Sequence, residues 1–261
     1  NQKQYINTVI TGKDEEEILK AVKTMAKNGM AEGFIVLYSR EKDPIISYLF
    51  DEGLLYVLVG KAFRNANQTI YVDNDNVLAG REAAQYLISL GHRRIAYLSG
   101  DHSQLFVGDR KAGCMLALTE NGLPVRQEYF IEASISSEAG RCQLEALLKS
   151  PERPTGIIVS DDILATWLER LCTDIGIQIP EELSVVSFNN SIFAKLTRPQ
   201  LTSVDVHSLQ LGTEAAAQMI SHIENPNLLA TKTIVPHHMA ERESCRPLPC
   251  TGAHGDEASL L

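Results

Sequence analysis

The segment at residues 71–100, YVDNDNVLAGREAAQYLISLGHRRIAYLSG, decides the fold because it contains the signals for one complete strand, helix and strand unit. Residues 73–76 offer side-chain oxygens to the free amides of a helix start, and residues 79–90 carry apolar side chains at helical spacing. Gly91 ends the helix, and residues 95–98 begin the next strand. This order predicts a parallel α/β unit.

The rest of the chain alternates between strand and helix signals in the same way. Strands are predicted at residues 8–11, 33–38, 56–59, 129–132, 156–159 and 183–188, and helices at residues 14–28, 43–52, 107–121, 137–148, 163–175 and 209–224. Such alternation is typical of a doubly wound sheet, so the predicted fold class is α/β. Residues 248–261 have no periodicity and are expected to form a disordered tail.

The composition restricts the partners of the chain. Lysine and arginine total 24 against 33 aspartate and glutamate residues, which gives a formal net charge of -9. Such a surface repels phosphate, so the chain by itself is not expected to bind DNA. The sequence has no apolar run of the roughly 20 residues that a membrane helix needs, and no membrane partner is expected. The five cysteines are an odd number, which favours free thiols in the cytoplasm over a disulfide scaffold.

Two blocks of sequence are more specific than an α/β fold requires. The first contains Asp75-Asn76 and LGHRRIA at residues 90–96, and the second is IPEELSVVSFNN at residues 179–190, followed by RPQLTSV at residues 198–204. In wording and order, these blocks resemble the effector-binding domain of LacI/GalR-family transcriptional regulators. The resemblance extends over residues 29–242, which is most of the chain.

The resemblance implies two Rossmann-like lobes with parallel sheets, in a type I periplasmic-binding-protein-like architecture that is incomplete at the N-terminus. The N-terminal lobe is then expected at residues 1–98 plus 208–233, and the C-terminal lobe at residues 99–206 plus 234–247. The chain is expected to cross between the lobes near Ser99, Val206 and Ile234. The family's helix-turn-helix module, its hinge and its opening strand and helix have no counterpart ahead of residues 8–11.

In a doubly wound sheet, ligands lie beyond the carboxyl ends of the strands. Arg110 and its neighbour Asp109 lie near the start of the helix that follows strand 95–98, and they resemble the ligand-binding arginine position of the family. A guanidinium offers a fork of donors that suits adjacent hydroxyls or a carboxylate. The alternative is a surface ion pair, with Asp109 as the helix cap.

Asp161 and Asn189 follow two other strands. Asp161 stands where the family usually has asparagine, and we expect it to accept hydrogen bonds from sugar hydroxyls, whereas Asp162 is the more structural position of the pair. Helix capping is the alternative for Asp161. Asn189, which precedes Asn190, replaces a family aspartate and is expected to present a neutral amide to the ligand. A turn role is the alternative for both asparagines.

Four further residues complete the predicted ligand site. Phe106, next to Leu105, is expected to stack on the apolar face of a sugar, with packing against the neighbouring lobe as the alternative. Ile135 occupies a place where relatives often carry an aromatic residue. Lys61, after Gly60, is expected to reach the ligand from the other lobe, unless it is simply solvated.

The leading prediction is a ligand sensor, the effector-binding and dimerisation core of a sugar-responsive transcriptional repressor. The resemblance implies a cytoplasmic homodimer that binds a sugar in the cleft between its lobes and operator DNA through the missing N-terminal module. Helices around residues 79–90 and 212–223 are expected to contribute to the dimer. The Asp109-Arg110 and Val59-Gly60-Lys61 combinations look most like regulators of maltose or related glucoside use.

Two other functions remain open at this stage. A sugar-binding protein of a transport system shares the architecture but needs an export signal, and the polar N-terminus does not resemble one. An enzyme is the third possibility, although the sequence has no Gly-x-Ser-x-Gly elbow, no zinc-ligand spacing and no phosphate loop. We therefore expect no catalytic residue, no cofactor and no metal, the pair His237-His238 included.

Overall fold

The structure is a computed structural model of the chain, and it describes residues 5–100, 102–133 and 137–248. The chain divides into two compact units. Unit 1 contains Asn1–Asp73, Ser103–Leu105 and Leu209–Val235, and unit 2 contains Asn74–His102, Phe106–Ser208 and Pro236–Leu261. Each unit is built on a predominantly parallel sheet, which confirms the predicted fold class.

Unit 1 has a four-stranded sheet in which all neighbouring strands are parallel. In the order β1-β2-β3-β9, the strands are Phe34–Val36, Tyr56–Val59, Ile70–Asp73 and Lys232–Ile234, and the accompanying helices are α1 (Glu15–Lys27), α2 (Pro44–Asp51) and α8 (Ser208–Glu224). Asp14 and Asp43 begin α1 and α2, because their carboxylates accept hydrogen bonds from backbone N–H groups of the first turn. These caps place the two helices at the positions that the sequence predicts.

The strand that we predict at residues 8–11 is wrong, because these residues have no regular structure. Ile6 is 93% exposed and Val9 is 82% exposed. A strand persists only where a neighbour accepts its backbone hydrogen bonds. Among the described strands, β1 lies at the edge of the sheet and pairs with β2 alone, and no strand pairs with residues 8–11.

Unit 2 has a six-stranded sheet in which only the pair β10–β8 is antiparallel. In the order β10-β8-β7-β6-β4-β5, the strands are His238–Ala240, Thr202–Asp205, Ser184–Phe188, Gly156–Val159, Ile95–Ser99 and Phe130–Glu132. The helices are α3 (Asn76–Ser89), α4 (Leu105–Glu120), η1 (Gln127–Tyr129), α5 (Glu138–Lys149), α6 (Asp162–Ile175) and α7 (Ile192–Leu196). The central strands β4, β6 and β7 are buried throughout, as expected for a sheet covered on both faces.

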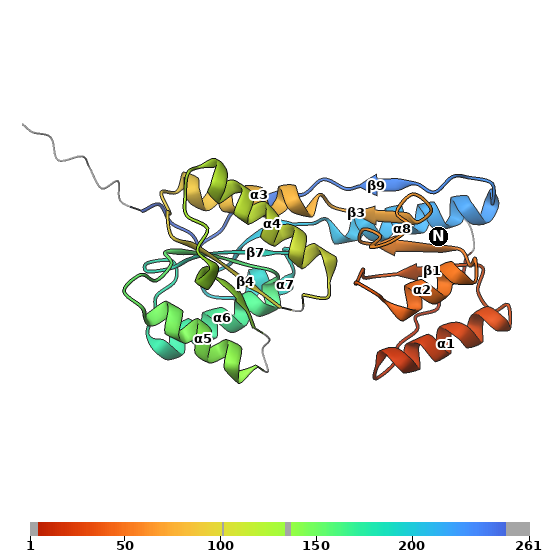
Figure 1. The fold of residues 1–261 in the computed structure, drawn as a ribbon, viewed down its shortest axis with the longest axis horizontal. Helices are drawn as coiled ribbons and strands as arrows, with labels where there is room; N and C mark the ends of the chain where they lie inside the picture. The colour runs from red at the N-terminus through yellow and green to blue at the C-terminus, as the bar shows by residue number, and fades with distance from the viewer. Residues whose placement is uncertain (1–4, 101, 134–136, 249–261) are drawn as a thin grey trace, which may run out of the picture. The chain divides into compact units, whose positions relative to one another are not determined.

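Two apolar clusters cover the two faces of this sheet. Leu98 and Val159 point toward one cluster, which includes side chains of α5 and α6. Tyr97 and Ile158, one residue away, point toward the other cluster, which includes side chains of α3 and α4. This alternation follows from the two-residue period of a strand, and Figure 1 shows the two helix pairs on opposite sides of the sheet.

Helices α3 and α4 touch through their backbones. A Cβ on Gly80 would lie 2.1 Å from Arg110 O, and a Cβ on Gly113 would lie 1.9 Å from Val77 O. A carbon atom cannot approach an oxygen so closely, so only glycine fits at these two positions. The contact fixes α4, and therefore Arg110, against α3.

The boundary of unit 2 differs from the lobe boundary that the sequence suggests. We expect residues 74–98 in the N-terminal lobe, whereas Asn74–His102 belongs to unit 2. The physical reason is that β4 pairs with β5 and β6, so the strand of residues 95–99 is part of the six-stranded sheet. The tail expected at residues 248–261 lies outside the described residues, apart from Leu248, whose N–H donates to Leu90 O at 2.8 Å.

None of the helices in the described part of the chain combines the length and the apolar character that crossing a membrane requires.

Candidate functional site

Arg110 is the central charged residue at the carboxyl ends of the strands of unit 2. It is only 4% exposed. Its Nε donates to Asn76 Oδ1 at 2.9 Å, and its Nη1 donates to Ser160 O at 2.8 Å. The guanidinium carbon lies 4.5 Å from the ring centre of Phe106 and 4.2 Å from that of Phe188. These contacts hold the guanidinium in place against two aromatic rings.

Asp161 caps the start of α6. Its Oδ1 accepts from Leu164 N at 2.9 Å, and its Oδ2 accepts from Ser160 Oγ at 3.2 Å. Ser160 Oγ in turn accepts from Gly100 N at 3.2 Å, which joins the ends of β4 and β6. The capping role that the sequence offers for Asp161 is therefore present, and ligand contact is a separate prediction.

Asn189 and Asn190 form the turn that follows β7. Their φ angles are 95° and 46°, a left-handed conformation that asparagine tolerates better than most residues. Asn189 N donates to Val204 O at 2.8 Å, whereas no hydrogen bond of its side-chain amide to another described residue is observed. Asn190 is tied to the protein, since its Nδ2 donates to Asp205 Oδ2 at 2.7 Å and its Oδ1 accepts from Arg242 Nη2.

Asp162 holds the neighbouring strands together from inside the unit. It is 1% exposed, and its Oδ1 accepts from Ser187 Oγ at 2.6 Å and from Ser203 Oγ at 2.8 Å. Its Oδ2 accepts from Ser191 N at 2.6 Å. A buried carboxylate is stable when donors surround it, and these three link α6 to β7, to β8 and to the start of α7.

The structure brings Arg110, Asp161 and Asn189 together at the carboxyl ends of the central strands of the six-stranded sheet. Arg110 binds the carbonyl of Ser160, the residue before Asp161, and it stacks on Phe188, the residue before Asn189. Phe106 joins them by stacking on Arg110. Asp109 follows Phe106 on α4 and is partly buried. The sequence did not indicate Asn76, which orients Arg110 from 34 positions away.

Three other predicted residues are assigned as follows. Lys61 and Leu105 belong to unit 1. Both contact Ser39, because Lys61 O accepts from Ser39 Oγ and Leu105 N donates to Ser39 O at 3.2 Å. Ile135 lies outside the described residues.

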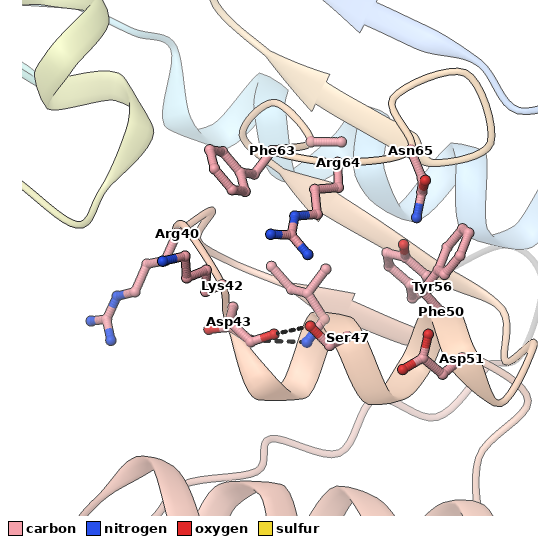
Figure 2. A pocket seen from close by; sticks show the side chains of 12 residues that line it. Arg40, Lys42, Asp43, Ser47, Phe50, Asp51, Tyr56, Phe63, Arg64 and Asn65 are labelled. Carbon is pink, nitrogen blue, oxygen red and sulfur yellow. Dashed lines mark hydrogen bonds between the residues drawn. The ribbon is translucent and has the colours of Figure 1, made fainter.

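Unit 1 has a cavity of its own, beside the loops that follow β1 and β2. Its volume is about 170 Å³, and Arg40, Lys42, Asp43, Tyr56, Phe63 and Arg64 are among the residues that line it. Figure 2 shows these side chains around the first turns of α2.

Asp43, 4% exposed, is a buried acidic residue in the lining of this cavity. Its Oδ1 accepts from Ile45 N and Ile46 N, both at 2.8 Å. Burial, together with the nearby charge of Asp43, raises the pKa of Tyr38 to about 12, so this phenol stays neutral. The lining of the cavity combines the rings of Tyr56 and Phe63 with charged side chains of both signs.

Comparisons with known proteins agree with this arrangement. The sequence profile of the periplasmic binding protein-like domain matches residues 84–245. The HTH-type transcriptional regulator MalR of Staphylococcus xylosus is 31% identical over 91% of this chain and 69% of its own length. A structure described as a transcriptional regulator LacI of Bacillus cereus subsp. cytotoxis is 38% identical, with a TM-score of 0.86 over 92% of this chain and 85% of that one. The complex of the transcriptional regulator CelR with cellobiose is 25% identical, with a TM-score of 0.80 over 87% of this chain and 70% of that one.

Proposed function

Because the chain belongs to the LacI family of transcriptional regulators, with a periplasmic binding protein-like domain as its core, we propose that Arg110, Asp161 and Asn189 bind the sugar to which this regulator responds. The family relation supports a regulator over the transport protein that the sequence left open. The observation that carries the proposal is the convergence of these three residues, through Ser160 and Phe188, at the ends of β4, β6 and β7.

The chemistry of this edge suits a neutral, hydroxyl-rich ligand. Asp161 offers carboxylate oxygens as acceptors, and the amide of Asn189 both donates and accepts. The ring of Phe106 offers an apolar surface of the kind on which sugars stack. Arg110 is an additional donor group in a dry surrounding, where hydrogen bonds to a charged group are strong.

A disaccharide of glucose is the ligand class that we propose. The relative with bound cellobiose shows that this fold accepts such a sugar in that protein, and a structural relative at 25% identity is named as a maltose operon repressor. Maltose and cellobiose differ only in the glycosidic linkage, so both belong in the test.

The test uses the variant Asn189→Gly. Glycine keeps the left-handed turn and removes the amide, so the fold is preserved while one ligand contact is lost. We expect the wild-type chain to gain thermal stability with maltose or cellobiose, and the variant to bind the same sugar at least about tenfold more weakly, the loss expected for one hydrogen bond to a ligand. Asn28→Gly, at the end of α1, is the control and keeps wild-type affinity.

Equal affinities of the wild-type chain and Asn189→Gly, for any sugar that stabilises both, would remove Asn189 from the site. The sugar affinity of Lys61→Ala tests in the same way whether Lys61, in unit 1, contacts the ligand. If no mono- or disaccharide in a broad screen stabilises the wild-type chain, the ligand class itself is wrong.

Operator binding and dimerisation belong to the proposal for the regulator as a whole, because the chain spans 69% of the length of MalR. We expect α3 and α8 to contribute to the dimer, and the apolar Val77 and Leu78 on α3 are 38% and 37% exposed. A cytoplasmic location follows from a role in transcription. Sedimentation at micromolar concentration tests the dimer. If the wild-type chain sediments as a monomer and Leu78→Glu does not change its sedimentation, the proposed dimer is contradicted.

The regulators to which the chain is related are not named as enzymes. We therefore propose that ligand binding alone, without a bond made or broken, is the output of this core. Steady release of a product from maltose or cellobiose by the purified chain would overturn that view.

A further inference from the structure

Three side chains with metal-binding groups meet in unit 2, apart from the residues proposed for the sugar. They are Asp205, His207 and His238, and one ligand atom from each lies within 4.8 Å of the others. No metal site is expected from the sequence, which has no zinc-ligand spacing. The fold brings these three residues together.

The antiparallel pair of strands β8 and β10 builds the cluster. Asp205 is the last residue of β8, His238 is the first residue of β10, and the two are directly opposite each other in the register. Opposed residues of an antiparallel pair have Cβ atoms about 5 Å apart on the same face of the sheet. The backbone pairing therefore places a carboxylate next to an imidazole.

A turn adds the second imidazole. His207 N donates to Asp205 Oδ1 at 2.7 Å, and His207 has a φ of 52°, a left-handed conformation in which histidine is several-fold enriched. This turn directs the ring of His207 back toward β10, where its centre lies 4.9 Å from the ring centre of His238.

The two ring nitrogens that face each other have the spacing of metal ligands. His207 Nε2 lies 3.1 Å from His238 Nδ1. Two nitrogens bound to one tetrahedral zinc ion at about 2.0–2.1 Å are roughly 3.3 Å apart. Without an ion, one ring must donate a proton to the other across this gap. An ion between them takes up both lone pairs instead.

Asp205 supplies the negative charge and the orientation. Its Oδ1 lies 3.8 Å from His207 Nδ1, which favours the tautomer with the proton on Nδ1 and the lone pair on Nε2, toward His238. Hydrogen bonds from Asn190 Nδ2 at 2.7 Å and from His207 N at 2.7 Å hold the carboxylate of Asp205 in place.

We propose that Asp205, His207 and His238 bind one divalent transition-metal ion of the zinc class. Two imidazoles and one carboxylate are a ligand set that zinc commonly uses, with water completing the coordination. The ion would join the segment between β8 and α8, which contains His207, to the start of β10, which follows β9. It would restrain these two segments at their ends in unit 2.

The test is a titration of the full chain with Co²⁺, and with Zn²⁺ in competition, in the presence of a phosphine reductant. We expect one ion per chain, visible ligand-field absorption, and no thiolate-to-cobalt charge-transfer band, because the proposed ligands contain no sulfur. His207→Asn keeps the left-handed turn, and His238→Ala removes an exposed ring. We expect each variant to bind Zn²⁺ at least about tenfold more weakly than the wild-type chain.

The control is His237→Gln, which removes the neighbouring imidazole that pairs with Glu82 at 3.0 Å and leaves the cluster unchanged. It should bind Zn²⁺ as the wild-type chain does. Thermal unfolding of all variants in a chelator shows that each still folds. The proposal fails if His238→Ala keeps wild-type affinity, if His237→Gln loses as much, if a thiolate band appears, or if Zn²⁺ does not bind at micromolar concentration.

Discussion

Arg110 carries its charge inside unit 2, where its Nε and Nη1 donate to Asn76 and Ser160 and its guanidinium packs against the rings of Phe106 and Phe188. The same contacts that orient it for a ligand also stabilise the fold. A substitution here must therefore be judged by two separate measurements, one of stability and one of ligand binding.

Arg110→Lys should lower both the stability of the fold and the affinity for the ligand. A lysine keeps the charge but cannot reach Asn76 Oδ1 and Ser160 O together, and it loses the stacking of a planar group. One buried acceptor left without a donor costs about 1–3 kcal/mol in the free energy of unfolding, measured in urea. Arg126→Lys, at a more exposed ion pair with Glu152, is the matched control and should change stability by less than about 0.5 kcal/mol. Equal stabilities of the two variants would show that the buried contacts of Arg110 contribute little.

Glu169, on α6, makes the stability depend on pH. Its Oε1 is buried without a hydrogen-bond partner among the described residues, and burial raises its pKa from 4.5 to about 7. The folded state thus holds the proton more tightly than the unfolded state does. The stabilisation is complete below about pH 4.5 and is lost as the pH rises through about 7.

Glu169→Gln should therefore be more stable than the wild-type chain at pH 8, by on the order of 2 kcal/mol, and the difference should shrink toward pH 5. Urea unfolding at several pH values measures this difference. Glu145→Gln removes a surface carboxylate that pairs with Lys149 and is the control. A gap between Glu169→Gln and wild type that stays constant from pH 5 to pH 8 would show that Glu169 ionises normally.

At the scale of the elements, the contact between α3 and α4 leaves no room for a side chain at two positions. The two helices meet without a layer of side chains at Gly80 and Gly113. Interiors resist added volume, and backbone atoms can move aside less easily than the end of a flexible side chain.

Gly113→Ala should lower the free energy of unfolding by about 2–3 kcal/mol, because the new methyl group meets Val77 O. Gly108→Ala, on the same helix, has no atom within 4 Å of the new methyl group and is the matched control. It should raise stability by about 0.5–1 kcal/mol through helix propensity. Thermal and urea unfolding measure both variants, and similar losses for the two would show that α3 and α4 do not pack as closely as described.

The sequence predicts elements best where they depend on local signals. Helix α6, bounded by Asp161 and Gly176, was predicted within one residue of Asp162–Ile175. Strand β8 was not predicted, because its fully buried Thr202 and Ser203 look like loop residues in the sequence. Only the fold shows that Ser203 Oγ donates to Asp162. The false strand at residues 8–11 is the reverse case, an apolar run without a partner strand.

In the candidate site too, the sequence indicates what depends on local signals and misses what depends on the fold. The positions of Arg110, Asp161 and Asn189 were indicated by the ends of predicted strands and by the family resemblance. Asn76, which orients Arg110, was not indicated, and neither was the meeting of His207 with His238. Both depend on packing and strand register, which one sequence does not show.

For the chain as a whole, the net charge of -9 disfavours binding to polyanions such as DNA. Binding to DNA depends on the release of counterions by lysine and arginine, which are outnumbered here. We expect no binding to a mixed-sequence DNA duplex at micromolar protein and about 0.15 M salt. An electrophoretic mobility assay measures this, and retardation of the duplex that weakens with added salt would reveal a basic surface that the overall charge conceals.

Strand β9 has one further consequence. It completes the sheet of unit 1 by pairing with β3, although more than half of the chain, and most of unit 2, lies between the two strands in the sequence. During synthesis, the chain must therefore have emerged as far as Ile234 before the sheet of unit 1 can close. Until then, the growing chain presents an uncovered edge at β3, open to any extended segment or chaperone that reaches it first.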